Sequence, residues 1–357
     1  MKVGKSAAVS FLFICIFVLS AALYLQFASF IFEYKSEFEN AANYHDHSVY
    51  LLNFESDVEN ANIFLQLGND LGIAYIYKAI TSVLPVLITK DMVLGSFIIN
   101  LAFLLVLYFL YAKICDLLEL GILGKLSFFA NTSLLYFTQL INKDIMTMVI
   151  FLLATYLAIK RNYIFIIAMI PLSLYVRLQL GIFLLCLIFL ISASRLRTRI
   201  LLVYFITSLV AAYIMILHPF IGEESLGDGL SSYVVSFNNT YPIGYLLFNP
   251  LRVVQFIIDL YYSFDINNVN GSIDVARVLR IPQVILLTYL IPSYYRLIRN
   301  WRVYKNTCCR DLVAFLAAFL CTWLMNPTVN ARYVILASPI IVLLGLYVKK
   351  SEQSHAY

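Results

Sequence analysis

The sequence predicts an all-α polytopic integral membrane protein with about ten transmembrane helices, both termini in the cytosol and two large outer loops that carry interfacial helices. Three observations predict this class. Hydrophobic residues make up 62% of the 357 residues and charged residues only 13%, which is more apolar surface than a soluble domain can bury. The apolar stretches are continuous, unlike the alternating strands of an outer-membrane barrel. The breaks between them alternate between basic and acidic or mixed, as loops on opposite sides of a membrane do.

The first apolar run follows two basic residues, Lys2 and Lys5, and extends over 6–32. This run is longer than the hydrophobic region of a signal peptide, so we expect an uncleaved first helix that starts in the cytosol. The later spans follow from apolar length and from the charged breaks. In a single membrane domain over 1–357, the spans are expected near 8–32, 91–112, 124–141, 145–159, 162–176, 178–194, 199–218, 279–296, 311–326 and 331–348.

Three strongly basic breaks support this order of spans. They lie at 160–161, 195–199 and 296–310, and all three fall on the cytosolic side if the N-terminus is cytosolic. Lysine and arginine accumulate in the cytosolic loops of membrane proteins. The formal net charge of +5 therefore reflects topology, and we predict no nucleic-acid partner.

Two long segments, about 33–90 and 219–278, are predicted on the outer side. Each contains an apolar piece, at 72–89 and at 245–262. Counting the first piece as a span would invert every later loop. We therefore predict that both pieces are helices at the outer interface.

A charged residue interrupts the apolar run over 163–193. One long helix through this run would place Arg177 at mid-membrane and the basic residues 195–199 on the outer side. Pro171 and the charge of Arg177 instead indicate a break between two short helices.

Three cations stand in tight turns on the outer side, where the positive-inside bias disfavours them: Lys143, Arg177 and Arg332. Arginine matches phosphate oxygens with a planar fork, and lysine adds a point charge. Together they predict a site for a membrane-embedded pyrophosphate. The alternative is that each cation pairs with a neighbouring acid or extends to the interface.

The first outer loop contains His45, Asp46 and His47 in sequence. Glycosyl transfer needs a base that takes a proton from a sugar hydroxyl, and an aspartate or histidine suits that role. A metal site is the competing interpretation. Side chains on adjacent residues diverge, so we predict no metal here. The simplest interpretation of the two histidines is that they are solvated loop residues.

These features resemble the bacterial O-antigen polymerases of the Wzy type and, more loosely, the GT-C glycosyltransferases. The resemblance covers most of the chain as a pattern of short motifs. A long first outer loop contains an aspartate, and a Lys-acid pair begins a later helix. An arginine begins the helix two spans after that one. Near the C-terminus, an Arg-Tyr turn precedes a proline. The matching residues are Asp46, Lys143-Asp144, Arg177, Arg332-Tyr333 and Pro339.

The resemblance implies a multi-pass protein of the bacterial inner membrane with its active site facing the periplasm. It implies joining of oligosaccharide repeat units carried on undecaprenyl pyrophosphate, without metal, nucleotide sugar or other cofactor. A chain-length regulator protein is a further candidate partner beside the lipid bilayer. Arg177 and Arg332 would then hold pyrophosphate with help from Lys143, Asp46 would be the base, and Asp144 would orient Lys143 or the acceptor. Tyr333, His45 and His47 are further candidates for substrate contact.

Three other functions remain open from the residues. The first is a GT-C-type enzyme that adds a single sugar from a polyprenyl-linked donor. The second is a flippase or other transporter of lipid-linked oligosaccharides, and the third is a structural membrane protein. Transporters place ionisable groups near the midplane. Here the span interiors contain almost no charge, which favours chemistry at one face over translocation.

Overall fold

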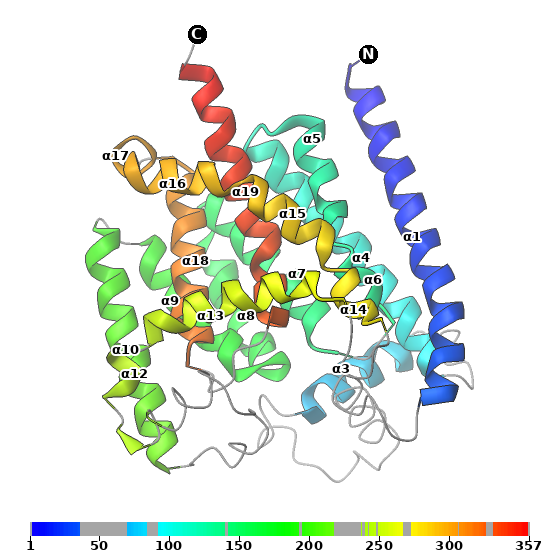
Figure 1. Ribbon diagram of the computed structural model, residues 1–357, viewed down its shortest axis with the longest axis horizontal. Coiled ribbons are helices and arrows are strands. Elements are labelled where there is room, and N and C mark those ends of the chain that lie inside the picture. The colour runs from blue at the N-terminus through cyan, green and yellow to red at the C-terminus, as the bar shows by residue number, and fades with distance from the viewer. Residues whose placement is uncertain are drawn as a thin grey trace.

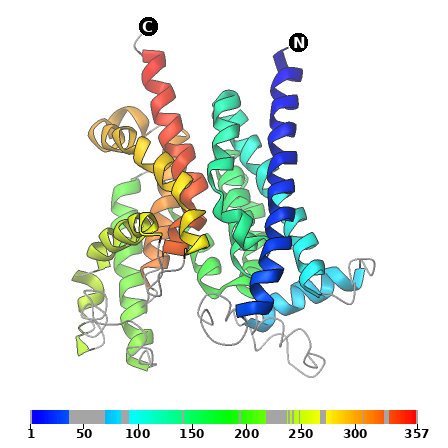
Figure 2. The same cartoon turned by 45° about the vertical axis from the view of Figure 1, so that its right-hand side comes forward.

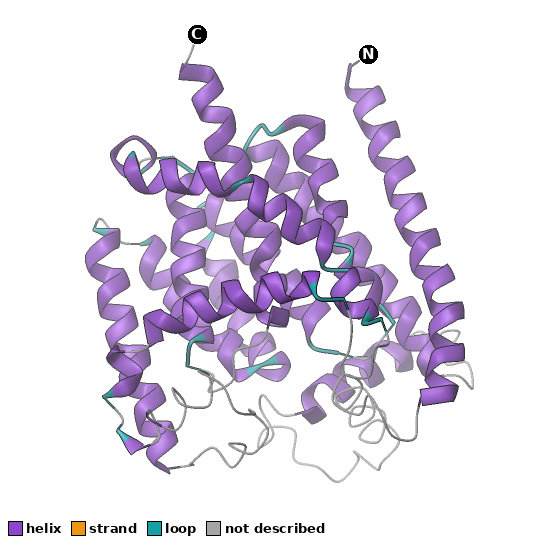
Figure 3. Cartoon of the chain, in the orientation of Figure 1, coloured by secondary structure: helices purple, strands orange, loops and turns teal. Residues whose placement is uncertain are grey.

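The computed structural model describes residues 2–35, 70–83, 92–139, 142–192, 195–217, 237, 240–241, 243–247, 249–266, 273–305, 307–325 and 331–355. Every secondary-structure element within these ranges is a helix (Figure 3). The predicted all-α class is therefore confirmed.

Four helices are long and apolar enough to cross a membrane: α1 (Lys2–Lys35), α4 (Met92–Leu117), α10 (Leu196–Leu217) and α19 (Ala331–His355). Each contains an apolar window of 18 to 23 residues. At 1.5 Å per residue, about 20 residues cross a hydrocarbon core of about 30 Å. These four helices therefore support the prediction, made from the composition, that this is a membrane protein.

Four shorter helices pack in the bundle: α7 (Asp144–Ile159), α8 (Tyr163–Val176), α9 (Leu178–Ile191) and α18 (Cys309–Trp323), of which α8 is largely exposed. They coincide with predicted spans but have only 14 to 16 residues each. Such lengths are short for a complete crossing.

Two predicted spans are wrong as continuous helices. The segment 124–141 is divided into α5 (Gly121–Leu126), a 3-10 turn η4 (Ser127–Ala130) and α6 (Ser133–Phe137). The polar residues Asn131 and Thr132 stand at the break, and the Thr132 hydroxyl donates to the Leu279 carbonyl. The backbone leaves the helical conformation at Asn131, with φ −81° and ψ 62°.

The segment 279–296 is divided in the same way. It consists of α15 (Ile281–Tyr289) and most of α16 (Ile291–Arg299), with α14 (Val275–Val278) before it and α17 (Trp301–Tyr304) after it. A proline stands in the first turn of both α15 and α16, where its missing N–H costs nothing, and Leu290 separates the two helices.

Both outer apolar pieces are helical where the structure describes them. The first is α3 (Asp70–Val83), and the second comprises α12 (Gly244–Leu247), α13 (Asn249–Tyr261) and the 3-10 turn η6 (Tyr262–Phe264). Their placement at a membrane interface stays a prediction.

A cluster of aromatic side chains joins α7, α9 and α18. The Phe183 ring of α9 lies 4.8 Å from Phe151 of α7 and 4.9 Å from Phe315 of α18, measured between ring centroids. Phe319 and Trp323 stack at 4.9 Å beside them. All five side chains are buried. Aromatic pairs of this kind add about 0.5–1.5 kcal/mol each beyond area burial.

Both chain termini lie at one end of the bundle. Figures 1 and 2 show both termini at the same end; α1 runs from there toward the opposite end, where α3 lies, and α10 runs in the same direction. Both termini on one side is what the predicted topology requires.

The packing of α3 on α8 predicts a sharp difference between two glycines. A Cβ on Gly72 would lie 2.2 Å from the backbone oxygen of Tyr175, whereas a Cβ on Gly181 would meet the end of the Leu174 side chain. We expect Gly72→Ala to destabilise the protein by about 1–3 kcal/mol and lower its Tm, because a backbone atom cannot move aside cheaply. Gly181→Ala is the matched control and should leave the Tm unchanged or raised. Thermal unfolding in detergent tests this, and equal Tm values for the two variants would contradict it.

Candidate functional site

A buried ion pair joins two of the predicted site residues. Arg177 Nη2 lies 2.8 Å from Asp144 Oδ1, with the Asp144 side chain fully buried and the Arg177 side chain 11% exposed. The two residues come from different helices, since Asp144 begins α7 and Arg177 separates α8 from α9. Removing one partner of such a pair leaves an uncompensated buried charge, so the pair constrains both helix ends.

The break at Arg177 was predicted from the sequence and is confirmed. Its backbone is extended, with φ −157° and ψ 133°, between two helices. Its N–H still donates to the Ser173 carbonyl at 2.9 Å, and its own carbonyl accepts from Leu180 at 3.0 Å. The break therefore costs few backbone hydrogen bonds. The alternative of one long helix over 163–193 is wrong.

Asn142, which is not among the predicted site residues, positions Asp144. The Asn142 Oδ1 accepts from the N–H groups of Asp144 at 2.9 Å and Ile145 at 3.2 Å. Its Nδ2 donates to the Phe137 carbonyl at 2.6 Å. Asparagine ahead of a helix that opens with an acidic residue is a typical capping signal, and it could have indicated this role.

The first turn of α19 lies beside the pair. The Tyr333 ring centroid is 5.9 Å from the guanidinium carbon of Arg177, within the range of a cation–π contact. Arg332 precedes Tyr333 in the same turn, and its side chain lies outside the described residues. The structure therefore brings together three of the predicted site residues, Asp144, Arg177 and Tyr333.

Lys143 immediately precedes α7 and is half-buried. Its carbonyl accepts from both the N–H and the hydroxyl of Thr147, at 2.9 Å and 2.7 Å. Asp144 is predicted to orient Lys143 or the acceptor, and in the structure it forms an ion pair with Arg177. Asp144 thus orients a guanidinium.

Buried polar groups outside the prediction connect α3 to this site. The Tyr77 hydroxyl donates to Asn100 Oδ1, and Asn100 Nδ2 donates to the Thr138 carbonyl at 3.1 Å. Tyr77 and Asn100 are both almost fully buried. Asn100 within the apolar run 92–117 was the available signal, because a buried amide needs partners.

The guanidinium of Arg177 keeps donor capacity beyond Asp144. Of its five N–H groups, those on Nη2 face the carboxylate, while Nε is buried and has no acceptor among the described residues. A buried donor without an acceptor costs about 1–3 kcal/mol. A phosphate oxygen is the kind of acceptor that removes such a cost.

The predicted base and its neighbours, His45, Asp46 and His47, lie outside the described residues. Across the part of the chain that the structure does describe, no three His, Cys, Asp or Glu side chains gather as a metal site would require. In comparisons with known proteins, no protein-family model, no curated protein and no solved structure matches this chain.

The buried pair predicts a reversal between single and double substitution. Asp144→Ala should lower the free energy of unfolding by about 3–5 kcal/mol, because Arg177 is left buried and unpaired. Combining Arg177→Met with Asp144→Leu should recover most of that loss, since an apolar pair of similar volume carries no desolvation penalty. Chemical unfolding of the purified variants in detergent measures both. A double variant as unstable as Asp144→Ala would show that the charges stabilise the fold beyond compensating each other.

Proposed function

We propose that this protein is a polysaccharide polymerase of the bacterial inner membrane. It joins oligosaccharide repeat units carried on undecaprenyl pyrophosphate into O-antigen or another surface polysaccharide at the periplasmic face. The observation that carries this proposal is the Arg177 guanidinium, fixed by buried Asp144 at a helix break beside the Arg332–Tyr333 turn. A fixed arginine fork near a second arginine suits the oxygens of a pyrophosphate.

The location of buried charge, at helix ends rather than mid-helix, disfavours translocation through the bundle. Among the described residues, the buried charged side chains are Asp144 and Asp311. Each lies in the first turn of its helix, and each pairs with an arginine. Transporters that carry ions or polar substrates place such groups near the midplane.

In the proposed reaction an acceptor sugar hydroxyl attacks the anomeric carbon of the lipid-linked donor. The new glycosidic bond forms as the bond to lipid pyrophosphate breaks, and the pyrophosphate leaves with the electron pair. Asp46 takes the hydroxyl proton. Arg177 and Arg332, with Lys143, stabilise the negative charge that develops on the leaving group.

Asp144 acts as a positioning residue in this scheme. Its carboxylate accepts one edge of the guanidinium, so that the remaining N–H groups of Arg177 keep one direction. Tyr333 adds an aromatic face on the guanidinium and, with His45 and His47, is available for contact with the sugar. A chain-length regulator protein in the same membrane would act on the product.

The decisive experiment compares the host glycan before and after deletion of the gene, separated as a ladder on a gel. We expect the ladder to collapse to a core that bears one repeat unit. A ladder that persists with every rung shifted in mass would identify a single-sugar transferase instead. Accumulation of lipid-linked units on the cytosolic side would identify a flippase.

Complementation of that deletion strain tests the site with a matched control. The double variant Arg177→Met with Asp144→Leu should insert into the membrane but produce no polymer. The same replacement at the other end of α7, Arg161→Met with Asp311→Leu, removes a more exposed pair at 3.0 Å and should retain the ladder. Arg177→Lys should restore little polymer, because the fork is lost. A normal ladder from the Arg177/Asp144 variant would refute the pyrophosphate site.

A further inference from the structure

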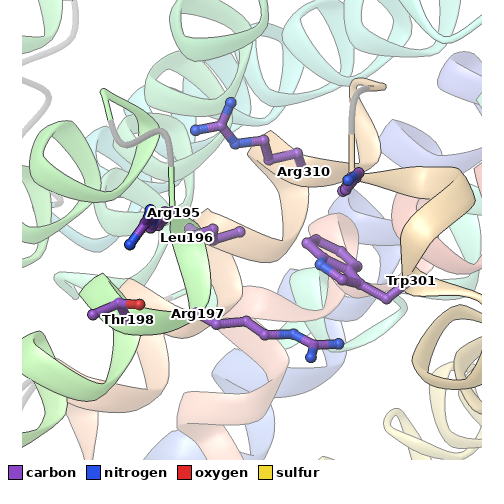
Figure 4. A pocket seen from close by; sticks show the side chains of 7 residues that line it. Arg195, Leu196, Arg197, Thr198, Trp301 and Arg310 are labelled. Atoms are coloured by element: carbon purple, nitrogen blue, oxygen red, sulfur yellow. The ribbon is translucent and has the colours of Figure 1, made fainter.

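A second basic site lies at the opposite end of the bundle from Arg177. Seven residues line a cavity of about 360 Å³ (Figure 4). They are Arg195, Leu196, Arg197, Thr198, Trp301, Lys305 and Arg310. Arg310 precedes Asp311, which pairs with Arg161 just beyond the C-terminal end of α7, whereas Asp144 begins that helix. The two sites are therefore separated by the length of α7.

Two segments far apart in the sequence build this cavity. One is the start of α10, and the other runs from α17 to the start of α18. Figure 4 shows the Arg195 and Arg197 side chains on one side, Arg310 from the other segment, and the Trp301 ring beside them. A positive-inside bias alone puts cations in loops but does not gather them around a common hollow.

The cations of this cavity lack salt-bridge partners within the described part of the chain, although the charge of Arg310 acts on neighbouring Asp311. No described acidic side chain forms a salt bridge with any of its four cations. Asp311 is bound by Arg161 at 3.0 Å, and one Nη of Arg310 is buried without a described acceptor. Neighbouring Arg199, by contrast, donates to the Phe189 carbonyl at 2.7 Å and to Ser192 at 3.0 Å.

Two further features suit an anion. The 22-residue helix α10 begins at Leu196, so its N-terminal N–H groups and dipole favour negative charge at the cavity. Trp301 is half-buried in the wall, and tryptophan is enriched where proteins meet lipid headgroups. Arginine forks, a helix N-terminus and an interfacial aromatic together match a phosphate next to a membrane.

We propose that this cavity binds a phosphate group, supplied by the headgroup of an anionic membrane phospholipid. Basic pockets between helices at the cytoplasmic side of membrane proteins recognise such headgroups. The cavity volume lies within the range of small-ligand sites. Inorganic phosphate offers the same oxygens without the lipid, so binding of each must be measured separately.

The test uses the full-length protein, purified in detergent and delipidated, with native mass spectrometry of bound ligand. Phosphatidylglycerol, phosphatidylcholine and inorganic phosphate are titrated in turn. We expect phosphatidylglycerol to bind and phosphatidylcholine to bind far more weakly. Arg195→Gln with Arg197→Gln should weaken phosphatidylglycerol binding by about tenfold or more, because two charge-assisted contacts are lost.

The matched control is Arg299→Gln with Arg302→Gln, which removes the same charge from two exposed arginines outside the cavity lining. This control should bind phosphatidylglycerol as the wild type does. Lys305→Gln, a single change at an exposed lining residue, provides a second test if the double variant unfolds. Equal loss in both double variants would overturn the site. Inorganic phosphate that binds with the same Arg195/Arg197 dependence, without lipid binding, would retain the phosphate site and overturn the lipid source.

Discussion

The structure depends on the burial of one charge pair. Asp144 is fully buried and Arg177 nearly so, at a point where three helices end or begin. In an apolar bundle neither charge is tolerable without the other, so the start of α7 and the α8–α9 break must meet. Asn142 completes the arrangement because it caps α7 from the preceding segment. Helix ends that would otherwise fray are thereby held in one geometry.

The two ends of α7 use the same chemistry with different exposure. Arg177 is 11% exposed against buried Asp144, whereas Arg161 is 49% exposed against buried Asp311. The aromatic cluster of α7, α9 and α18 lies between these pairs and connects them through close packing. One end therefore holds its arginine inside protein, and the other lets its arginine reach solvent beside a basic cavity. This difference in exposure distinguishes the proposed catalytic site at Arg177 from the proposed lipid site beside Arg161.

Local sequence predicted helices where apolar runs were long and uninterrupted, as over α4 and α19. It also predicted the Arg177 break, because one charge in an apolar run is a strong local signal. It failed at 124–141, where the helix breaks at Asn131 and Thr132 and the Thr132 hydroxyl bonds to the Leu279 carbonyl, a group distant in sequence. Mean hydropathy over a window of neighbouring residues does not show such a break, because one or two polar residues change the mean little and their bonding partners lie outside the window.

The sequence by itself determined the helical class, the apolar character suited to a membrane and the identity of the unusual cations. Composition and period carry that information because they depend on residues close together in the chain. Only the tertiary structure decided which acid meets which cation. Asp144 was the expected neighbour of Lys143, and folding also brings it to Arg177. The four cations around Trp301 are likewise a product of folding, because the two segments that carry them meet only when α10 packs against α18.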